Sequence, residues 1–163
     1  MISSCGPDQG NQPDKQAVSG GTAAAGDIQT VPGIEKLEFS DSIKLQADEN
    51  MRFNRELFRV RAGVKLSLIL KNASFQAANS MTHNVVILKS GTDLADFAEV
   101  AGKAKNQQYI PSELDSLIIA HTRLVPAGGS DTVECKIPRK GVYDFICSFP
   151  GHWGTMQGKI VAE

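Results

Sequence analysis

Apolar and polar residues alternate along most of the chain from Ile34 onward, and this alternation constrains the fold more than any other feature. It is regular in stretches 64–71 and 132–137. Successive side chains of a strand point to opposite faces of a sheet, so the pattern predicts strands with one buried face. The strands we expect are 42–47, 56–61, 64–71, 83–89, 117–122, 132–137, 141–147 and 157–162.

Turn-forming residues separate these segments. Glycine and proline gather at 62–63, 90–91, 126–129 and 138–141. Many short strands with such punctuation predict an all-β sandwich or barrel. One stretch breaks the period of two, since apolar residues in 93–105 recur at helical spacing behind a possible cap at Thr92 or Asp93. We therefore expect one short helix inserted between strands.

The first 33 residues differ from the remainder of the 163-residue chain. They are rich in Gly, Ala, Ser, Pro and Gln and contain no aromatic residue. Such a composition offers too little apolar surface to offset the entropy of ordering. We predict a disordered tether over 1–33 and a single domain over 34–163.

Cys5 stands near the start of this tether, after Ile2-Ser3-Ser4. The four residues resemble a bacterial lipobox, in which the cysteine becomes lipidated. A signal peptide also needs a basic region and an apolar stretch upstream, where this sequence has only Met1. Two interpretations stay open: a removed signal with a lipidated Cys5, or an incidental cysteine in a tail.

Charge and cysteine content exclude several classes. The formal net charge is −1, so no polybasic surface suggests nucleic acid as a partner. No apolar run reaches the roughly 18 residues that a membrane-spanning helix needs. The three cysteines are too few for a disulfide framework.

The segment from Cys147 to Met156, CSFPGHWGTM, carries the chemistry. It offers a thiolate, the imidazole of His152 and a thioether within ten residues, between two predicted strands. A turn at Pro150-Gly151 can bring the three side chains together. Two imidazoles and one thiolate with a weak axial thioether form a mononuclear blue-copper site.

Such a site requires a second histidine, either His83 or His121. His83 begins an apolar strand, so it would face the loop end of the sandwich where Cys147 also lies. Its neighbour Asn84 can supply amide hydrogen bonds to the cysteine loop. His121 has no companion residue, and we expect it to be an exposed or partly exposed histidine at a strand end.

With these motifs in view, the chain resembles the cupredoxins, the type 1 blue copper proteins, and among them azurin and auracyanin. The CSFPGH segment with Met three residues later, the stretch THNVVIL and the stretch LIIAHTRLVPAGGSDTV carry the resemblance. It covers roughly 42–161. It implies a cupredoxin-like Greek-key β-sandwich holding one copper ion per chain.

The resemblance also implies roles for single residues. His83 Nδ1, Cys147 Sγ and His152 Nδ1 would be the strong ligands and the Met156 sulfur the weak axial one. The backbone carbonyl of Thr82 would contact the metal from the opposite side, although azurins usually have glycine there. The backbone N–H groups of Phe149 and of a residue near Asn84 would bond the thiolate.

Two features depart from the azurin pattern. Azurins carry a disulfide whose positions correspond here to Asp41 and Val64, so that staple is absent. We expect Cys135 to be a small buried hydrophobic residue instead. Met51, Pro150 and Trp153, together with Phe149, are predicted to form an apolar docking patch around His152.

The function expected is one-electron transfer between Cu(II) and Cu(I), without enzymatic activity. Expected partners are redox proteins such as c-type cytochromes or a respiratory or photosynthetic complex, met by a monomer in the bacterial periplasm or on an extracytoplasmic membrane surface. A binuclear copper site is excluded because Gly151 stands where a second cysteine is needed. Too few histidines remain for a multicopper oxidase or nitrite reductase, and too few methionines for a copper chaperone. A redox-inert zinc or copper sandwich is the alternative that stays open.

Overall fold

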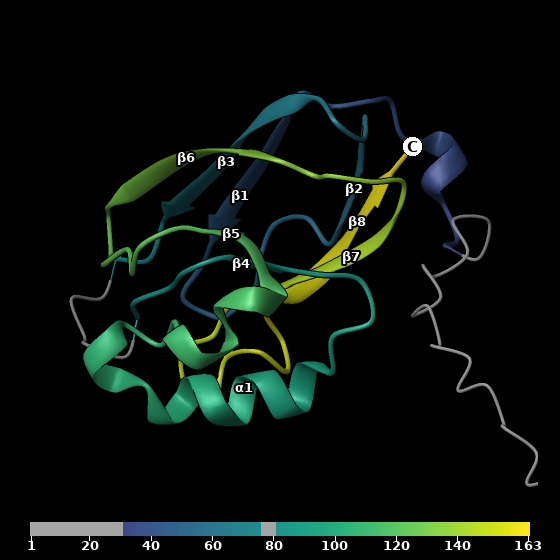
Figure 1. Ribbon diagram of the computed structural model, residues 1–163. Helices are drawn as coiled ribbons and strands as arrows, with labels where there is room; N and C mark the ends of the chain where they lie inside the picture. The colour runs from purple at the N-terminus through teal and green to yellow at the C-terminus, as the bar shows by residue number, and fades with distance from the viewer. Residues whose placement is uncertain (1–30, 76–80) are drawn as a thin grey trace, which may run out of the picture.

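Two β-sheets stacked face to face make up the body of the computed structural model, which describes residues 31–75 and 81–163 (Figure 1). The predicted tether with Cys5 lies outside the described residues, apart from 31–33. A short 3-10 turn, Ile34–Lys36, precedes the first strand. None of the described helices is long and apolar enough to cross a membrane.

The smaller sheet has three strands in the order β1 (Ser42–Ala47), β3 (Lys65–Asn72) and β6 (Ser130–Lys136). The larger sheet has the order β2-β8-β7-β4-β5. Its strands are β2 (Leu57–Val60), β4 (Val86–Leu88), β5 (Ile118–His121), β7 (Gly141–Ile146) and β8 (Gln157–Ala162). The pairs β1–β3 and β2–β8 are parallel, and the other neighbours are antiparallel. The prediction of an all-β sandwich is confirmed.

The core lies between the sheets, where the alternating apolar residues meet. Leu66, Leu68 and Leu70 of β3 are buried against residues of the larger sheet such as Phe58 and Phe145. The register is fixed because a shift of one residue would turn all three leucines to solvent. The first residue of the strand predicted over 64–71 does not follow the alternation, because Val64 lies just before β3 and is 49% exposed.

Helix α1 (Leu94–Lys103) covers the outer face of the larger sheet. The Asp93 carboxylate accepts hydrogen bonds from the backbone N–H groups of Ala95 and Asp96 and begins the helix as its N-cap. The helix therefore begins one residue and ends two residues inside the predicted range. Two 3-10 segments, Lys105–Gln107 and Ser112–Leu117, connect it to β5.

The strand predicted over 83–89 is shorter, because only Val86–Leu88 form a ladder. Before it, the N–H of Val85 donates to the Thr122 side chain rather than to a backbone carbonyl. His83 instead forms an isolated two-bond bridge with Val125. The chain thus leaves the sheet just before β4, which turns His83 and Asn84 into the interior at this end of the sandwich.

Candidate metal centre

Three possible metal ligands meet at one end of the sandwich. The loop between β7 and β8, which carries two of them, lies beside α1 (Figure 1). Cys147 directly follows β7, and His83 lies just ahead of β4. These strands are antiparallel neighbours, with Val86 opposite Ile146, so the last residue of β7 and the first residue of β4 lie at the same end of the sheet. His152 comes from the loop between β7 and β8, which returns to the same end.

The ligand atoms of His83, Cys147 and His152 all lie within 4.8 Å of one another. The two Nδ1 atoms are 3.2 Å apart, and the Cys147 sulfur is 3.7 Å from His152 Nδ1. All three side chains are buried, and even His152 is only 4% exposed. The site is therefore a closed cluster of two imidazoles and one thiol.

A tight loop places Cys147 and His152 side by side. The N–H of His152 donates to the Phe149 carbonyl across Pro150 and Gly151, and Gly151 has a φ of 83°. Proline followed by a residue with positive φ is typical of a type II turn, which favours glycine at the second position. The turn predicted at Pro150-Gly151 therefore forms, and it aims His152 back at Cys147.

Met156 closes the same loop. Its carbonyl accepts from the N–H of Cys147 and its own N–H donates to the His152 carbonyl, both at 2.9 Å. Its side chain is fully buried in the sandwich core, beside Cys147. Met156 is thus held by the loop in the same buried core cluster as Cys147.

A pair of hydrogen bonds joins the two ligand-bearing segments. Asn84 Nδ2 donates to Ser148 Oγ and the Ser148 N–H donates to Asn84 Oδ1, each at 2.8 Å. The Ser148 hydroxyl then donates to the Tyr109 carbonyl at 2.7 Å. Both side chains are buried, so these bonds fix the His83 segment against the Cys147 loop.

Aromatic rings cover the outer side of the cluster. The Phe149 ring packs against His152 with ring centroids 4.7 Å apart, and Tyr109 packs edge-on against Phe149 at 5.0 Å. Phe149 is half-buried and Pro150 is exposed. These rings explain why His152 has almost no exposed surface.

Burial sets the protonation of the metal-free cluster. It lowers the pKa of His83 to about 4, with a further contribution from His152, and it lowers the pKa of His152. It raises the pKa of the Cys147 thiol to about 11, although backbone hydrogen bonds from Asn84 and Phe149 act in the opposite direction. The cluster without metal therefore holds two neutral imidazoles and a neutral thiol at pH 7.

These residues fit a soft transition metal. The imidazole nitrogens face each other, and within the described residues the other nitrogen of His83, Nε2, is buried without a hydrogen-bond partner. Metal–nitrogen bonds of about 2.0 Å and metal–sulfur bonds of about 2.3 Å allow two ligands of one ion to lie up to roughly 4 Å apart, and both separations satisfy this limit. Thiolate and imidazole select copper or zinc over magnesium or calcium.

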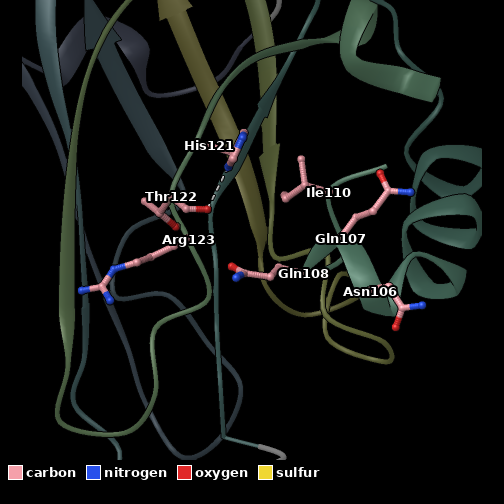
Figure 2. A pocket seen from close by; sticks show the side chains of 7 residues that line it. All are labelled: Asn106, Gln107, Gln108, Ile110, His121, Thr122 and Arg123. Carbon is pink, nitrogen blue, oxygen red and sulfur yellow. Dashed lines mark hydrogen bonds between the residues drawn. The ribbon is translucent and has the colours of Figure 1, made fainter. Parts of the chain in front are cut away.

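His121 lies away from this cluster, as expected. It is the exposed last residue of β5, and its ring contacts the Thr122 carbonyl at 3.0 Å. Figure 2 shows it on the wall of a separate hollow that Gln107 and Gln108 also line. The choice between the two candidate histidines thus falls on His83 by position.

The expectation that Cys135 is buried is wrong, whereas the docking patch predicted with Trp153 stays a prediction. Trp153 is half-buried and packs on the cluster formed by α1 and the outer face of the larger sheet, so it supports the helix rather than standing free. Cys135 is a free thiol that faces the core but is only half-buried, because β6 is an edge strand. Met51 is also half-buried against the core.

Sequence reasoning missed Tyr109 and Asn72. Tyr109 sits in the left-handed region with φ of 62°, directly after Gln108 at 55°, and no sequence signal marks such a pair. Asn72 did leave a signal, because it occupies the next inward position after Leu66, Leu68 and Leu70. An amide where the alternation calls for an apolar side chain points to a buried polar role.

Fold and cluster together define a single-copper protein of the cupredoxin class. The profile of the family described as copper binding proteins, plastocyanin/azurin family, matches residues 41–163. The chain belongs to this family, and its cofactor is copper.

Curated relatives agree with this assignment. Auracyanin-A of Chloroflexus aurantiacus is 35% identical over 121 residues, which are 71% of this chain and 69% of the relative. Azurin-2 of Alcaligenes xylosoxydans xylosoxydans is 30% identical over 120 residues, 71% of this chain and 92% of the relative. Outer membrane protein H.8 of Neisseria gonorrhoeae is 33% identical over 120 residues; the match covers 71% of this chain and only 64% of that protein.

Solved structures show the same fold. Reduced auracyanin from Roseiflexus castenholzii superposes with a TM-score of 0.66 at 31% identity, over 77% of this chain and 99% of that one. An azurin from Methylomonas sp. strain J gives a TM-score of 0.67 at 23% identity, over 75% of this chain and 97% of that one. The second likeness concerns the fold alone.

Proposed function

We propose that this protein is a one-electron carrier with a type 1 copper site and no enzymatic activity. The observation that carries the proposal is the preformed cluster: two imidazoles and a thiol lie within 4.8 Å of one another, buried and cross-linked by hydrogen bonds. When bound there, copper would supply a one-electron Cu(II)/Cu(I) couple. The chain's task is to hold the same ligand positions in both oxidation states.

His83, Cys147 and His152 are the proposed strong ligands, and Met156 is the proposed weak axial one. The Thr82 carbonyl is proposed as a weak contact on the opposite side. Binding requires the Cys147 proton to leave, because the thiolate is the ligand. The backbone hydrogen bonds from Asn84 and Phe149 to the sulfur favour that anionic form.

Electrons would enter and leave near His152. Since this side chain is only 4% exposed, the proposed contact surface is the covering layer, Phe149 and Pro150, with Met51 at its margin. Trp153 would contribute through its exposed part while anchoring α1. The domain from 34 on carries 16 basic and 15 acidic residues, so a small apolar contact, rather than charge, would guide a redox partner.

We further propose that the domain acts outside the cytoplasm, in the bacterial periplasm or at an extracytoplasmic membrane surface. The likeness to a protein named outer membrane protein H.8 supports this location, as does the lipobox-like Cys5. A c-type cytochrome or a respiratory or photosynthetic complex is the kind of partner that a monomeric carrier would serve there.

Copper titration tests the proposal. Metal-free protein should bind one Cu(II) per chain and turn intensely blue through thiolate-to-copper charge transfer, and reductant should bleach the colour reversibly. Cys147→Ser should stay colourless. His121→Ala is the matched control, since its imidazole lies outside the cluster, and it should stay as blue as the wild type.

Two results would overturn the proposal. A colourless wild type that binds Zn²⁺ but cannot be oxidised and reduced would make the domain a redox-inert metal protein. A blue Cys147→Ser variant would place the thiolate ligand elsewhere.

A further inference from the structure

His83 lies outside any β-ladder, so its position depends on a few contacts. Its N–H donates to the Val125 carbonyl at 3.1 Å, and the Val125 N–H donates back to the His83 carbonyl at 2.7 Å. These two bonds form an isolated bridge rather than part of a sheet. A ligand held by one bridge needs further support to keep its place.

Asn72, the last residue of β3, supplies that support. Its side chain is fully buried, and Nδ2 donates to the carbonyls of both Met81 and Val125. Its Oδ1 accepts from the N–H of Ser74 at 3.1 Å, so the amide uses both its donors and its acceptor. One side chain thus binds both segments that form the His83–Val125 bridge: Val125 itself, and Met81 two residues before His83.

The Asn72 backbone is fixed as well. Its N–H donates to the Gly129 carbonyl, and its carbonyl accepts from the N–H of Gly128, at 2.9 and 3.0 Å. The amide therefore projects from a rigid point at the end of β3 in the smaller sheet. The segment it holds lies at the end of the larger sheet where the metal cluster is found.

We infer that Asn72 is the positioning residue for the His83 side of the metal centre. Its Nδ2 holds the Met81 and Val125 carbonyls in place, and these two points determine where the Thr82–His83 backbone runs. Asn84 and Ser148 perform the corresponding task between His83 and the cysteine loop. This inference rests on the proposed ligand role of His83.

Asn72→Ala removes the bonds to Met81 and Val125, and its effect can first be measured without any metal. In the metal-free protein, the amide of His83 should exchange with solvent about fivefold faster or more relative to the Phe145 amide in β7. Normalising to Phe145 separates a local opening at the bridge from a general loss of stability.

Copper supplies the second readout. Asn72→Ala should bind Cu(II) about 10- to 100-fold more weakly, the usual effect of losing a group that orients a ligand. The shape of its visible and electron paramagnetic resonance spectra should also change. Asn72→Ser, which can donate only one of the two bonds, should fall between Asn72→Ala and the wild type, and it serves in place of Asn72→Ala if that variant fails to fold.

Two controls separate positioning from packing. Ser74→Ala changes a buried neighbour whose hydroxyl has no hydrogen-bond partner among the described residues, so it should leave exchange and spectra unchanged. Leu66→Ala should lower stability through a cavity at the far end of β3 and also leave the spectra unchanged.

Unchanged His83 exchange and unchanged spectra in Asn72→Ala would overturn the inference. So would spectral changes of equal size in Leu66→Ala, because the effect would then be general loosening. If the wild type bound no copper, the proposed function would fail, whereas the exchange measurement would still decide whether Asn72 holds the His83 bridge.

Discussion

At the scale of single residues, burial and hydrogen bonding determine the chemistry of the site. A cysteine, two histidines and a methionine can be ordinary core residues in other proteins. Here Cys147 Sγ lies 3.7 Å from His152 Nδ1, and both side chains are buried. The enclosure keeps both imidazoles neutral and available as ligands. It also gives two measurable consequences, one for the axial position and one for stability in acid.

The axial position is tested by changing Met156. A thioether favours Cu(I), whereas an amide oxygen favours Cu(II). Met156→Gln should therefore lower the reduction potential of the copper protein and Met156→Leu should raise it, as measured by potentiometric titration. Equal potentials in wild type and both variants would show that Met156 does not interact with the metal.

Stability in acid follows from His83. Its pKa in the folded protein is lowered from 6.5 to about 4, chiefly by burial, so the unfolded chain takes up a proton in this range that the folded chain does not. The metal-free protein should therefore have its full stability above about pH 6.5 and lose roughly 3 kcal/mol as the pH falls to 4. The shift of His152 has the same sign.

Urea unfolding at several pH values measures this loss. His83→Gln should show a shallower dependence on pH, whereas His121→Ala, which changes an exposed ring, should retain the wild-type slope. A His83→Gln protein with an unchanged slope would mean that another group causes the acid sensitivity.

At the scale of elements, neighbouring strands bring the candidate ligands together. β4 and β7 run antiparallel side by side, so the segments that carry His83 and Cys147 meet at one end of the sheet. β8 starts at Gln157, directly after Met156, and lies between β7 and β2. Any distortion of β8 should therefore spread to the metal loop as well as to the core.

Gly158 of β8 is the most sensitive point of this arrangement. A Cβ there would overlap the Glu56 carbonyl group and the Phe145 ring. Gly158→Ala should thus lower the free energy of unfolding by about 1–3 kcal/mol, the usual cost of overpacking, and thermal unfolding would measure it. Gly154→Ala is the matched control, because a Cβ at Gly154 meets nothing within 4 Å, and it should be nearly neutral.

At the scale of the whole molecule, the metal centre and the start of the domain lie at opposite ends. The Arg59 guanidinium binds the Glu163 carboxylate at 3.1 Å and the Leu37 carbonyl at 3.2 Å, and it stacks with Arg61 on the Phe39 ring. These contacts hold the first turn of the domain beside the C-terminus, away from α1 and the metal loop (Figure 1). A tether attached there would leave the metal end free for a partner.

The proposed tether gives a test at the same scale. The precursor expressed in a Gram-negative host should fractionate with membranes, because bacterial lipoproteins carry several acyl chains and one chain alone anchors only marginally. Cys5→Ala should release it in soluble form. Cys135→Ala is the control and should stay with the membranes, while a wild type found wholly in the soluble periplasm would rule out lipidation.

The sequence by itself determined the sandwich, the inserted helix and the copper chemistry. Strand alternation is local and repeats every two residues, and the motif from Cys147 to Met156 lies within one loop, so neither needs information from distant parts of the chain. His83 could be preferred to His121 because of its place ahead of a strand and because Asn84 stands beside it.

Only the tertiary structure decided how closed the site is and what supports it. Trp153 packs beside α1 and Phe149 covers the ring of His152, so both side chains are less exposed than their places in a surface loop suggest. Asn72 and His83 are neighbours because β3 ends beside the Val125 bridge in space. Such contacts join segments far apart along the chain, and the period of a strand or the spacing of a motif carries no information about them.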